Sequence, residues 1–427
     1  MRIIVCACAA VLPLMGEVAP LPSKDAEGRY QTRAVTGHVT NYREDAVPPY
    51  HLPDPLVLNN GQPVRNANDW FERRRPELIQ AYEREIFGRV PRSAPPVRFE
   101  EAEPAAPAFD GKAVRRRIVA HFGGPARGVD VSFVIYTPAT AIGPVPLVLH
   151  LSFGGDPGLP GRTKPRGMPE ALHNDIGPVA DLMARGYGYA IVLYTEIQPD
   201  RPNAQHEGVI GLALAPGQEK QAPDEWGGIA AWSWGLSRFM DYLQTDQRID
   251  ARRVVLVGHS RLGKTALWAG ASDPRFALIY SSQSGEMGAA LSRRDFGETV
   301  DDIATGLAHE FAGNFQKYIG HWNEMPHEAH LLIALSAPRP VFISAADGDP
   351  WSDPYGQFLA TVAAGPVWRL LGQHDLGTSE RPGLNTPIAT GDLAFLENHG
   401  PHLISPLDWK TLLDFADRHL KAIVSKK

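Results

Sequence analysis

Residues 253–264 read Arg-Val-Val-Leu-Val-Gly-His-Ser-Arg-Leu-Gly-Lys, and this stretch is the strongest indication of the fold class. The apolar run Val254–Val257 predicts a buried strand that ends at Gly258, and the run Thr265–Ala269 predicts a helix. Ser260 lies on the turn between them. A strand, a sharp turn bearing a serine and a helix are typical of a nucleophile elbow, whose helix N-terminus favours an oxyanion. The alternative is an ordinary βα turn with a surface serine.

Short apolar runs separated by helical segments continue on both sides of this stretch. Their alternation predicts βαβ units and a mostly parallel sheet flanked by helices in three layers. Residues 113–136 alternate polar and apolar side chains, which predicts antiparallel strands at a sheet edge. The predicted parallel strands are Leu147–Leu151, Tyr189–Tyr194, Arg253–Val257, Ala277–Ser281, Pro340–Ala345 and Val367–Leu371.

The N-terminal part of the chain has a different composition. Residues 1–19 begin with one arginine and a short apolar run, which predicts a secretory signal peptide and export to the periplasm or the medium. The two cysteines, Cys6 and Cys8, lie within it. Residues 20–109 are expected to form an N-terminal extension: a proline-rich arm to about residue 65, either packed on the domain or partly ordered, then a helix over residues 68–87 capped by Asn68. Residues 110–427 then form the catalytic domain.

Composition excludes several classes of function. A net charge of −6 gives no reason to expect nucleic acid or an anionic membrane as a partner. No histidine or cysteine cluster has metal-ligand spacing, and neither a phosphate-binding glycine loop nor a dinucleotide fingerprint occurs. The sequence therefore predicts no metal, no cofactor and no membrane span, and we expect a monomer.

The elbow departs from the usual G-x-S-x-G pattern because Leu262 stands at the second glycine. Ser260, Arg261 and Lys264 instead resemble the G-x-S-R-x-G-K signature of glucuronoyl esterases, carbohydrate esterase family 15. Residues 285–299 (Gly-Glu-Met-Gly-Ala-Ala-Leu-Ser-Arg-Arg-Asp-Phe-Gly-Glu-Thr) and the tryptophan-rich residues 224–238 are also similar to this family. The resemblance covers roughly residues 110–425, and it implies an α/β-hydrolase fold.

A serine hydroxyl needs a base, and in this fold the acid and the histidine follow the serine along the chain. His402 is the candidate base. It lies on an irregular Gly-Pro stretch before the last predicted helix, six residues ahead of an Asp-Trp pair, as in the family. His399 and His374 are its rivals.

The acid of the triad is less clearly marked. Many family members have a glutamate where this chain has Gln283, and an amide carries no charge to stabilise an imidazolium. Asp349 follows the predicted strand Pro340–Ala345 and is the preferred acid, although an aspartate in Asp-Gly-Asp-Pro can also simply cap a turn. Glu286 is the alternative acid. Two further candidates, Asp347 and Asp353, rank below them.

The remaining predictions concern the oxyanion and the sugar. The Arg261 backbone N–H is expected in the oxyanion hole, with a second donor from Phe153-Gly154-Gly155. The resemblance implies that the Arg261 guanidinium also reaches the oxyanion; a surface salt bridge is the alternative. It implies substrate contacts for a set of side chains whose alternative role is structural: Lys264, Gln283, Glu298 and Trp351. Glu310 stands where relatives more often have tryptophan.

Together these features predict a serine esterase acting through an acyl-enzyme. The resemblance implies that its substrates are esters of (4-O-methyl-)glucuronic acid, which link glucuronoxylan to lignin alcohols. One alternative is an acetyl or feruloyl xylan esterase with the same triad. Another, motivated by Gln283, is a catalytically impaired relative that binds uronate polysaccharide.

Overall fold

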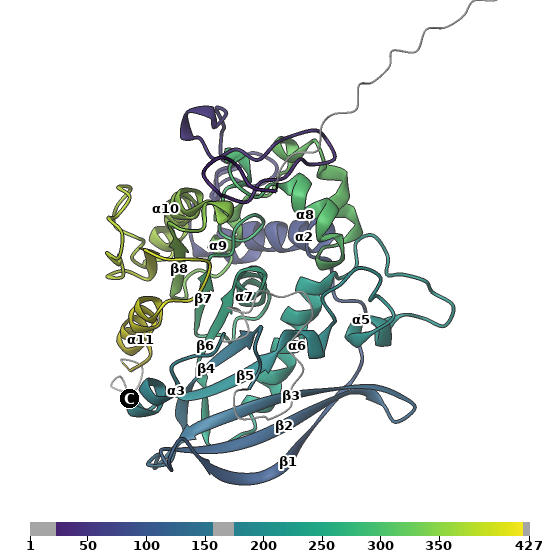
Figure 1. Cartoon of the computed structure of the whole chain (residues 1–427), viewed down its shortest axis with the longest axis vertical. Coiled ribbons are helices and arrows are strands. Elements are labelled where there is room, and N and C mark those ends of the chain that lie inside the picture. Colours follow the sequence, from purple (N-terminus) through teal and green to yellow (C-terminus); the bar gives the residue numbers. More distant parts are fainter. Residues whose placement is uncertain (1–22, 157–174, 422–427) are drawn as a thin grey trace, which may run out of the picture.

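The computed structural model describes residues 23–156 and 175–421, so the predicted signal peptide lies outside the described residues. Within these residues, nine strands form one sheet in the order β1-β2-β3-β5-β4-β6-β7-β8-β9 (Figure 1). The strands are β1 Val97–Ala108, β2 Ala113–Gly124, β3 Arg127–Pro138, β4 Val145–Ser152, β5 Gly188–Leu193, β6 Ile249–His259, β7 Leu278–Ser282, β8 Val341–Ala346 and β9 Leu393–Asn398.

The sheet has an antiparallel edge and a parallel body. β1, β2 and β3 form an antiparallel meander, and β3 pairs antiparallel with β5. All pairings from β5 to β9 are parallel. The strand order reverses at β4, which lies between β5 and β6, and ligands bind outside the carboxyl ends of strands at such a switch point. The predicted α/β-hydrolase fold is confirmed.

Helices cover both faces of the sheet. Because successive strand residues point to opposite faces, each strand contributes side chains to the core on either side of the sheet. On β4, Leu147 and Leu149 pack into one core and Val148 into the other. The first core contains side chains of α6 (Gly228–Leu243), α7 (Arg261–Ser272), α9 (Ala329–Ala334) and α10 (Pro354–Leu370), and the second those of α3 (Val179–Ala184) and α11 (Pro406–Lys421). These are the outer layers of the sandwich, and α6 and α7 lie side by side in Figure 1.

The other helical segments are short or peripheral. They are α1 Ala67–Asp69, the π-helical η2 Trp70–Arg74, α2 Arg75–Glu85, α4 Tyr194–Ile197, α5 Gly208–Ala213 and α8 Val300–Gly306, and the 3-10 turns η1 Glu44–Ala46, η4 Ser292–Arg294, η5 Ala308–Glu310, η6 Gly313–Tyr318, η7 Trp322–Glu324 and η8 Pro350–Ser352. Among the described residues, no helix is both long and apolar enough to cross a membrane.

One predicted strand is wrong. Residues 367–370 form the C-terminal end of helix α10 and Leu371 is its C-cap, although Pro366 precedes them within the helix. A short apolar run does not distinguish a buried helix from a buried strand, and here the buried Ala360, Ala364 and Val367 supply helical spacing. The strand that completes the sheet is β9, Leu393–Asn398, all of whose residues are buried.

The N-terminal extension is well packed against the domain. The Thr36 hydroxyl donates to Asp301, and the amide of Gly297 donates to the carbonyl of Asn41 at 2.8 Å. The predicted helix over 68–87 is divided into α1, η2 and α2, and its cap is Asn66 rather than Asn68, since the Asn66 side chain accepts from the amide of Asp69. Strand β1 also lies before residue 110, so the sheet begins within the segment predicted as the extension.

Candidate active site

The elbow has the predicted strand–turn–helix form. β6 ends at His259, α7 begins at Arg261, and Ser260 between them has φ 56° and ψ −130°. A positive φ is strained for a residue with a side chain. A Cβ on Gly258 would lie 2.0 Å from the carbonyl oxygen of Leu262, so the tight turn requires glycine there.

The shifted second glycine also has a packing reason. A Cβ on Gly263 would lie 2.9 Å from the Oγ of Ser281 and 3.0 Å from the Cβ of Ser284. The first turn of α7 therefore approaches the end of β7 at residue 263, and the side chain of Leu262 is buried in the core.

A pocket of about 360 Å³ opens at this elbow. Residues from the carboxyl ends of β6, β7 and β8 and from the loop before α11 meet in it, as expected at a switch point. Every catalytic or substrate-binding side chain predicted for the site lines the pocket except the alternative acid Glu286, and the predicted oxyanion donors Phe153-Gly154-Gly155 do not line it. The predicted residues in it are Ser260, Arg261, Lys264, Gln283, Glu298, Asp349, Trp351 and His402.

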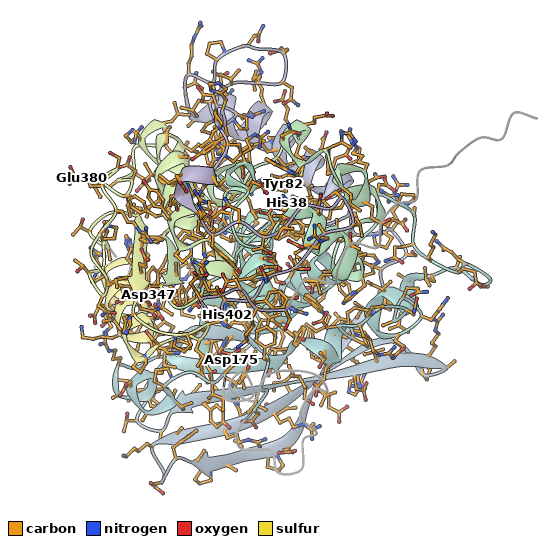
Figure 2. All side chains as sticks on the ribbon, turned by 45° about the horizontal axis from the view of Figure 1, so that its top comes forward. His38, Tyr82, Asp175, Asp347, Glu380 and His402 are labelled. Atoms are coloured by element: carbon orange, nitrogen blue, oxygen red, sulfur yellow. The ribbon has the colours of Figure 1, made fainter. Side chains whose placement is uncertain are left out.

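His402 (labelled in Figure 2) is held by Asp349. The Nδ1 atom of His402 lies 2.6 Å from the Oδ2 of Asp349, which is buried. Although burial opposes ionisation, the charge and hydrogen bond of His402 lower the pKa of Asp349 below its ordinary value. An Nδ1–H donated to this carboxylate leaves Nε2 as the acceptor of the ring, and His402 lines the pocket.

A second histidine packs against the first. The ring centroid of His259 lies 4.4 Å from that of His402. Burial, followed by the charge of His402, lowers the pKa of His259 to about 3. The His259 ring is therefore neutral at physiological pH and places no full charge beside His402.

The two other groups considered near the histidine have different partners. Glu286 is buried and accepts a short hydrogen bond from the Ser292 hydroxyl, and burial raises its pKa well above the ordinary value. The structure does not bring it to His402. Gln283 donates from Nε2 to the carbonyl of Leu403 at 2.7 Å and so fixes the residue next to His402.

The rival histidines lie elsewhere. The Nδ1 of His399 is 2.8 Å from the Oδ2 of Asp347, and this pair is exposed. The side chain of His374 is 89% exposed. Asp353 is ion-paired with Arg294 at 2.8 Å. None of them lines the pocket at Ser260.

Arg261 extends from the elbow into a cluster of acidic side chains. Its Nη1 lies 2.5 Å from Asp200 and 3.0 Å from Glu310, whose side chain is completely buried. Asp200 also contacts the Nε2 of His309 at 2.8 Å and accepts from the hydroxyl of Tyr194 at 2.8 Å. Burial raises the pKa of Asp200, but the contacts with His309 and Arg261 outweigh burial and lower this pKa to about 2. Burial raises the pKa of Glu310.

This cluster resembles a metal site in composition. Ligand atoms of Asp200, His309 and Glu310 lie within 4.8 Å of one another. However, the guanidinium of Arg261 is ion-paired with both carboxylates and supplies the positive charge that a cation would bring.

The oxyanion donors agree only in part with the sequence-based expectation. The backbone N–H of Arg261, in the first turn of α7, has no acceptor among the described residues. By contrast, Phe153 donates to Asp175 at 3.1 Å, and Gly154 and Gly155 donate to the Ser152 hydroxyl at 3.0 and 3.3 Å. The expectation for Phe153-Gly154-Gly155 is therefore wrong, because internal bonds of the loop after β4 occupy these amides.

The opposite part of the pocket is polar and aromatic. Lys264 is buried, and its ammonium lies 3.3 Å from Glu298. The backbone N–H of Glu298 in turn donates to the carbonyl oxygen of Trp351 at 2.8 Å. The indole of Trp351 makes an edge contact with Tyr30, the ring centroids being 4.7 Å apart.

Sequence reasoning missed Tyr30 and Asp200. Tyr30 lies in the proline-rich arm, which has no periodic pattern that would orient a side chain. Asp200 follows β5 and α4, and its place after the carboxyl end of a parallel strand was the available signal.

Comparisons with known proteins agree on one family. A family model described as glucuronyl esterase, fungi, matches residues 221–372. A carbohydrate esterase named MZ0003, from an unknown prokaryotic organism, is 38% identical over 400 residues, which cover 89% of this chain and 92% of that protein. A 4-O-methyl-glucuronoyl methylesterase of Phanerochaete carnosa is 28% identical, covering 76% and 73% of the two chains.

Solved structures give the same result. A glucuronoyl esterase from Solibacter usitatus superposes with a TM-score of 0.83 at 41% identity, covering 88% of this chain and 100% of the other. A promiscuous family 15 esterase from a marine bacterial metagenome gives a TM-score of 0.80 at 38% identity, covering 89% and 100%. The chain belongs to carbohydrate esterase family 15, the glucuronoyl esterases.

Proposed function

We propose that this protein hydrolyses esters of (4-O-methyl-)glucuronic acid, with Ser260 as nucleophile, His402 as base and Asp349 as the orienting acid. The observation that carries the proposal is the 2.6 Å contact between His402 and Asp349 in the pocket that Ser260 lines. Serine, histidine and a buried carboxylate in this relation are the parts of an acyl-transfer site.

The reaction begins when the Nε2 of His402 removes the Ser260 proton and the serine oxygen attacks the ester carbonyl. The negative charge on the tetrahedral carbonyl oxygen faces the Arg261 backbone N–H and the Arg261 guanidinium. The intermediate collapses, the C–O bond to the alcohol breaks, and His402 returns its proton to the leaving alkoxide. Water deprotonated by His402 then attacks the acyl-enzyme and releases glucuronate and free Ser260.

Asp200 and Glu310 anchor the guanidinium before substrate binds. The Nη1 of Arg261 contacts both carboxylates, whereas its other guanidinium nitrogens have no acceptor among the described residues. Its side chain is 29% exposed and lines the pocket, so N–H groups remain for an oxyanion. Such preorganisation avoids reorganisation during the reaction.

Lys264, Glu298 and Trp351 are suited to hold a sugar ring. The ammonium and the carboxylate donate to and accept from hydroxyl groups, and the indole offers a flat apolar face to sugar C–H groups. Because Lys264 is buried beside its ion-pair partner Glu298, a sugar hydroxyl that bridges them exchanges one polar contact for another.

The test compares two esters. We expect a higher kcat/KM for benzyl glucuronate than for p-nitrophenyl acetate, and loss of both activities in Ser260→Ala. A large preference for the acetate would contradict the glucuronoyl assignment while leaving the esterase assignment intact.

A second candidate is a broader esterase that also accepts acetyl or feruloyl xylan. The structure similar to this chain at 38% identity is described as a promiscuous esterase, which favours testing those esters beside glucuronates. The alternative of an impaired relative that binds uronate polysaccharide without cleaving it rests on Gln283. The carboxylate of Asp349 on His402 supports catalysis instead.

We further propose that the chain is exported through residues 1–19 and acts as a monomer. The apolar run behind a single arginine supports export. N-terminal sequencing of the mature protein tests the first statement, since a chain that begins at Met1 contradicts it. Light scattering tests the second, and we expect a mass near 46.6 kDa less the signal peptide.

A further inference from the structure

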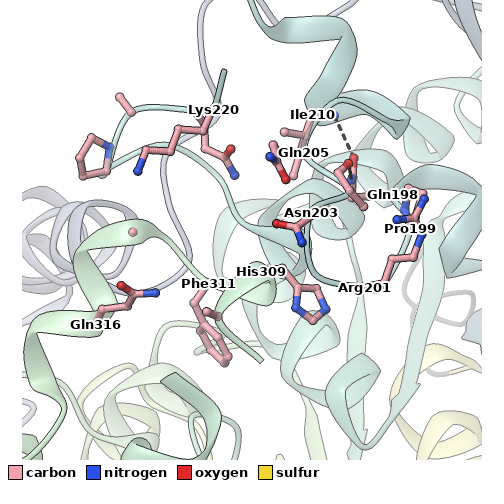
Figure 3. A pocket seen from close by; sticks show the side chains of 16 residues that line it. Gln198, Pro199, Arg201, Asn203, Gln205, Ile210, Lys220, His309, Phe311 and Gln316 are labelled. Carbon is pink, nitrogen blue, oxygen red and sulfur yellow. Dashed lines mark hydrogen bonds between the residues drawn. The ribbon is translucent and has the colours of Figure 1, made fainter. Parts of the chain in front are cut away.

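A second pocket, of about 400 Å³, lies beside the active site (Figure 3). The loop that includes Pro199 and Asn203, the loop that includes Lys220, and the residues from Ala308 to Gln316 line it. Its volume lies within the range of small-molecule sites, about 300–1,000 Å³. None of the steps proposed for ester hydrolysis uses it.

The two pockets share a wall. Leu307 lines the active-site pocket and the next residue, Ala308, lines the second pocket. His309 of the second pocket contacts Asp200 at 2.8 Å, and Asp200 contacts Arg261 of the active site at 2.5 Å. The second pocket therefore adjoins the active-site pocket on the side of Arg261.

The lining is rich in amides and contains no Asp or Glu among the described residues. Gln198 forms a fixed part of it, because its Nε2 donates to the carbonyl of Ala204 at 3.0 Å and its Oε1 accepts from the amide of Ile210 at 3.0 Å. In contrast, the side-chain amides of Gln205 and Gln316 have no hydrogen-bond partner in the part of the chain that the structure describes. Figure 3 shows both at the cavity.

This chemistry matches a sugar better than an aromatic alcohol. A side-chain amide both donates and accepts, as a hydroxyl group does. Among the described residues of the lining, Phe311 is the one phenylalanine, tyrosine or tryptophan, and at 2% exposure it presents little ring surface for stacking.

We propose that the second pocket binds a hydroxylated sugar unit of the polysaccharide that carries the ester, with Gln205 and Gln316 as hydrogen-bonding residues. This inference rests on the proposed function, because it takes a glucuronoyl ester of a polysaccharide as the substrate. It assigns the polysaccharide, and not the alcohol of the ester, to the side of Arg261 where the second pocket lies.

The experiment uses the double variant Gln205→Ala/Gln316→Ala. Its matched control is Gln247→Ala, which removes an exposed amide just before β6, away from the carboxyl end of that strand. Two substrates are compared: benzyl glucuronate, and the benzyl ester of glucuronate attached to a xylo-oligosaccharide. Binding of the unesterified xylo-oligosaccharide is measured separately by calorimetry.

For the extended ester we expect the double variant to lose about tenfold in kcat/KM, mostly through KM, as two lost hydrogen bonds predict. Benzyl glucuronate, which does not reach the second pocket, should be hydrolysed at a similar rate, and the control should resemble the wild type. An equal fall on both esters, or no fall on the extended ester, overturns the inference.

Calorimetry separates this inference from the proposed function. We expect the double variant to bind the xylo-oligosaccharide about tenfold more weakly than the wild type does. If the wild type cleaves neither ester, the proposed function fails, but this binding difference still decides the role of the pocket. Equal affinity in wild type and double variant rejects the subsite.

Discussion

The Oδ2 of Asp349 lies 2.6 Å from the Nδ1 of His402, although the two residues are 53 positions apart. The end of β8 and the loop before α11 bring them together. With Gln283 at the position where many relatives have a glutamate, Asp349 is the carboxylate that contacts this imidazole.

We predict that Asp349→Asn lowers kcat by about 10³–10⁴, because the amide favours the wrong histidine tautomer and leaves the imidazolium without a counter-charge. Steady-state kinetics on benzyl glucuronate measure this. The matched control is Asp347→Asn, which alters the exposed Asp347–His399 pair and should remain within a few-fold of wild type. A kcat above one tenth of the wild-type value in Asp349→Asn would show that another group orients His402.

We predict that Glu286→Gln is more stable than wild type above neutral pH. Burial is the largest cause of the raised pKa of Glu286. The charges of Glu328 and Glu298 raise this pKa further, while the hydrogen bond from Ser292 lowers it. A raised folded pKa means that the folded state holds a proton the unfolded state releases, so wild-type stability falls as pH rises above about 4.5, the ordinary value. The neutral amide removes this loss.

Thermal melts at several pH values check the prediction. The difference in melting temperature between Glu286→Gln and wild type should shrink as pH falls toward 4.5. A variant that melts below wild type at pH 8 would indicate that the ionised carboxylate stabilises the fold.

We predict that Arg261→Gln lowers kcat by about 10²–10³, equivalent to the 3–4 kcal/mol lost with one oxyanion donor. The change also leaves Asp200 and Glu310 without their cation, which destabilises the fold. The double variant Arg261→Gln/Glu310→Gln removes one of these charges, so stability should recover in part while kcat stays low. Recovery of kcat together with stability would assign Arg261 a structural role only.

We predict that Tyr30→Ala raises KM several-fold with a smaller change in kcat, because Tyr30 lines the pocket and supports Trp351, which is proposed to hold the sugar ring. Tyr50→Ala, in the same arm but outside the pocket, is the control. Equal KM values in the two variants would show that the arm serves the fold and not the substrate.

The sequence predicts the parts of this protein that local patterns determine. The elbow, the parallel strands from β4 to β8 and the order of serine, acid and histidine all follow from apolar runs, turns and the resemblance. The sequence leaves more than one acid open, because it does not show which carboxylate shares the end of the sheet with His402. In the structure Asp349 contacts His402, whereas Glu286 accepts a hydrogen bond from Ser292.

Other features depend on tertiary contacts that leave no pattern. Val367 and its neighbours have the apolar run of a strand, but packing completes helix α10. The amides after β4 are occupied by Asp175 and Ser152. Tyr30 reaches the site only because the arm folds back over the domain.

The central claim, that His402 activates Ser260, is tested most directly by labelling with a fluorophosphonate followed by peptide mass spectrometry. We predict one covalent adduct, on the peptide that contains Ser260. Its formation should slow by orders of magnitude in His402→Ala and should not occur in Ser260→Ala. Labelling at another residue, or an equal rate in wild type and His402→Ala, would contradict the account.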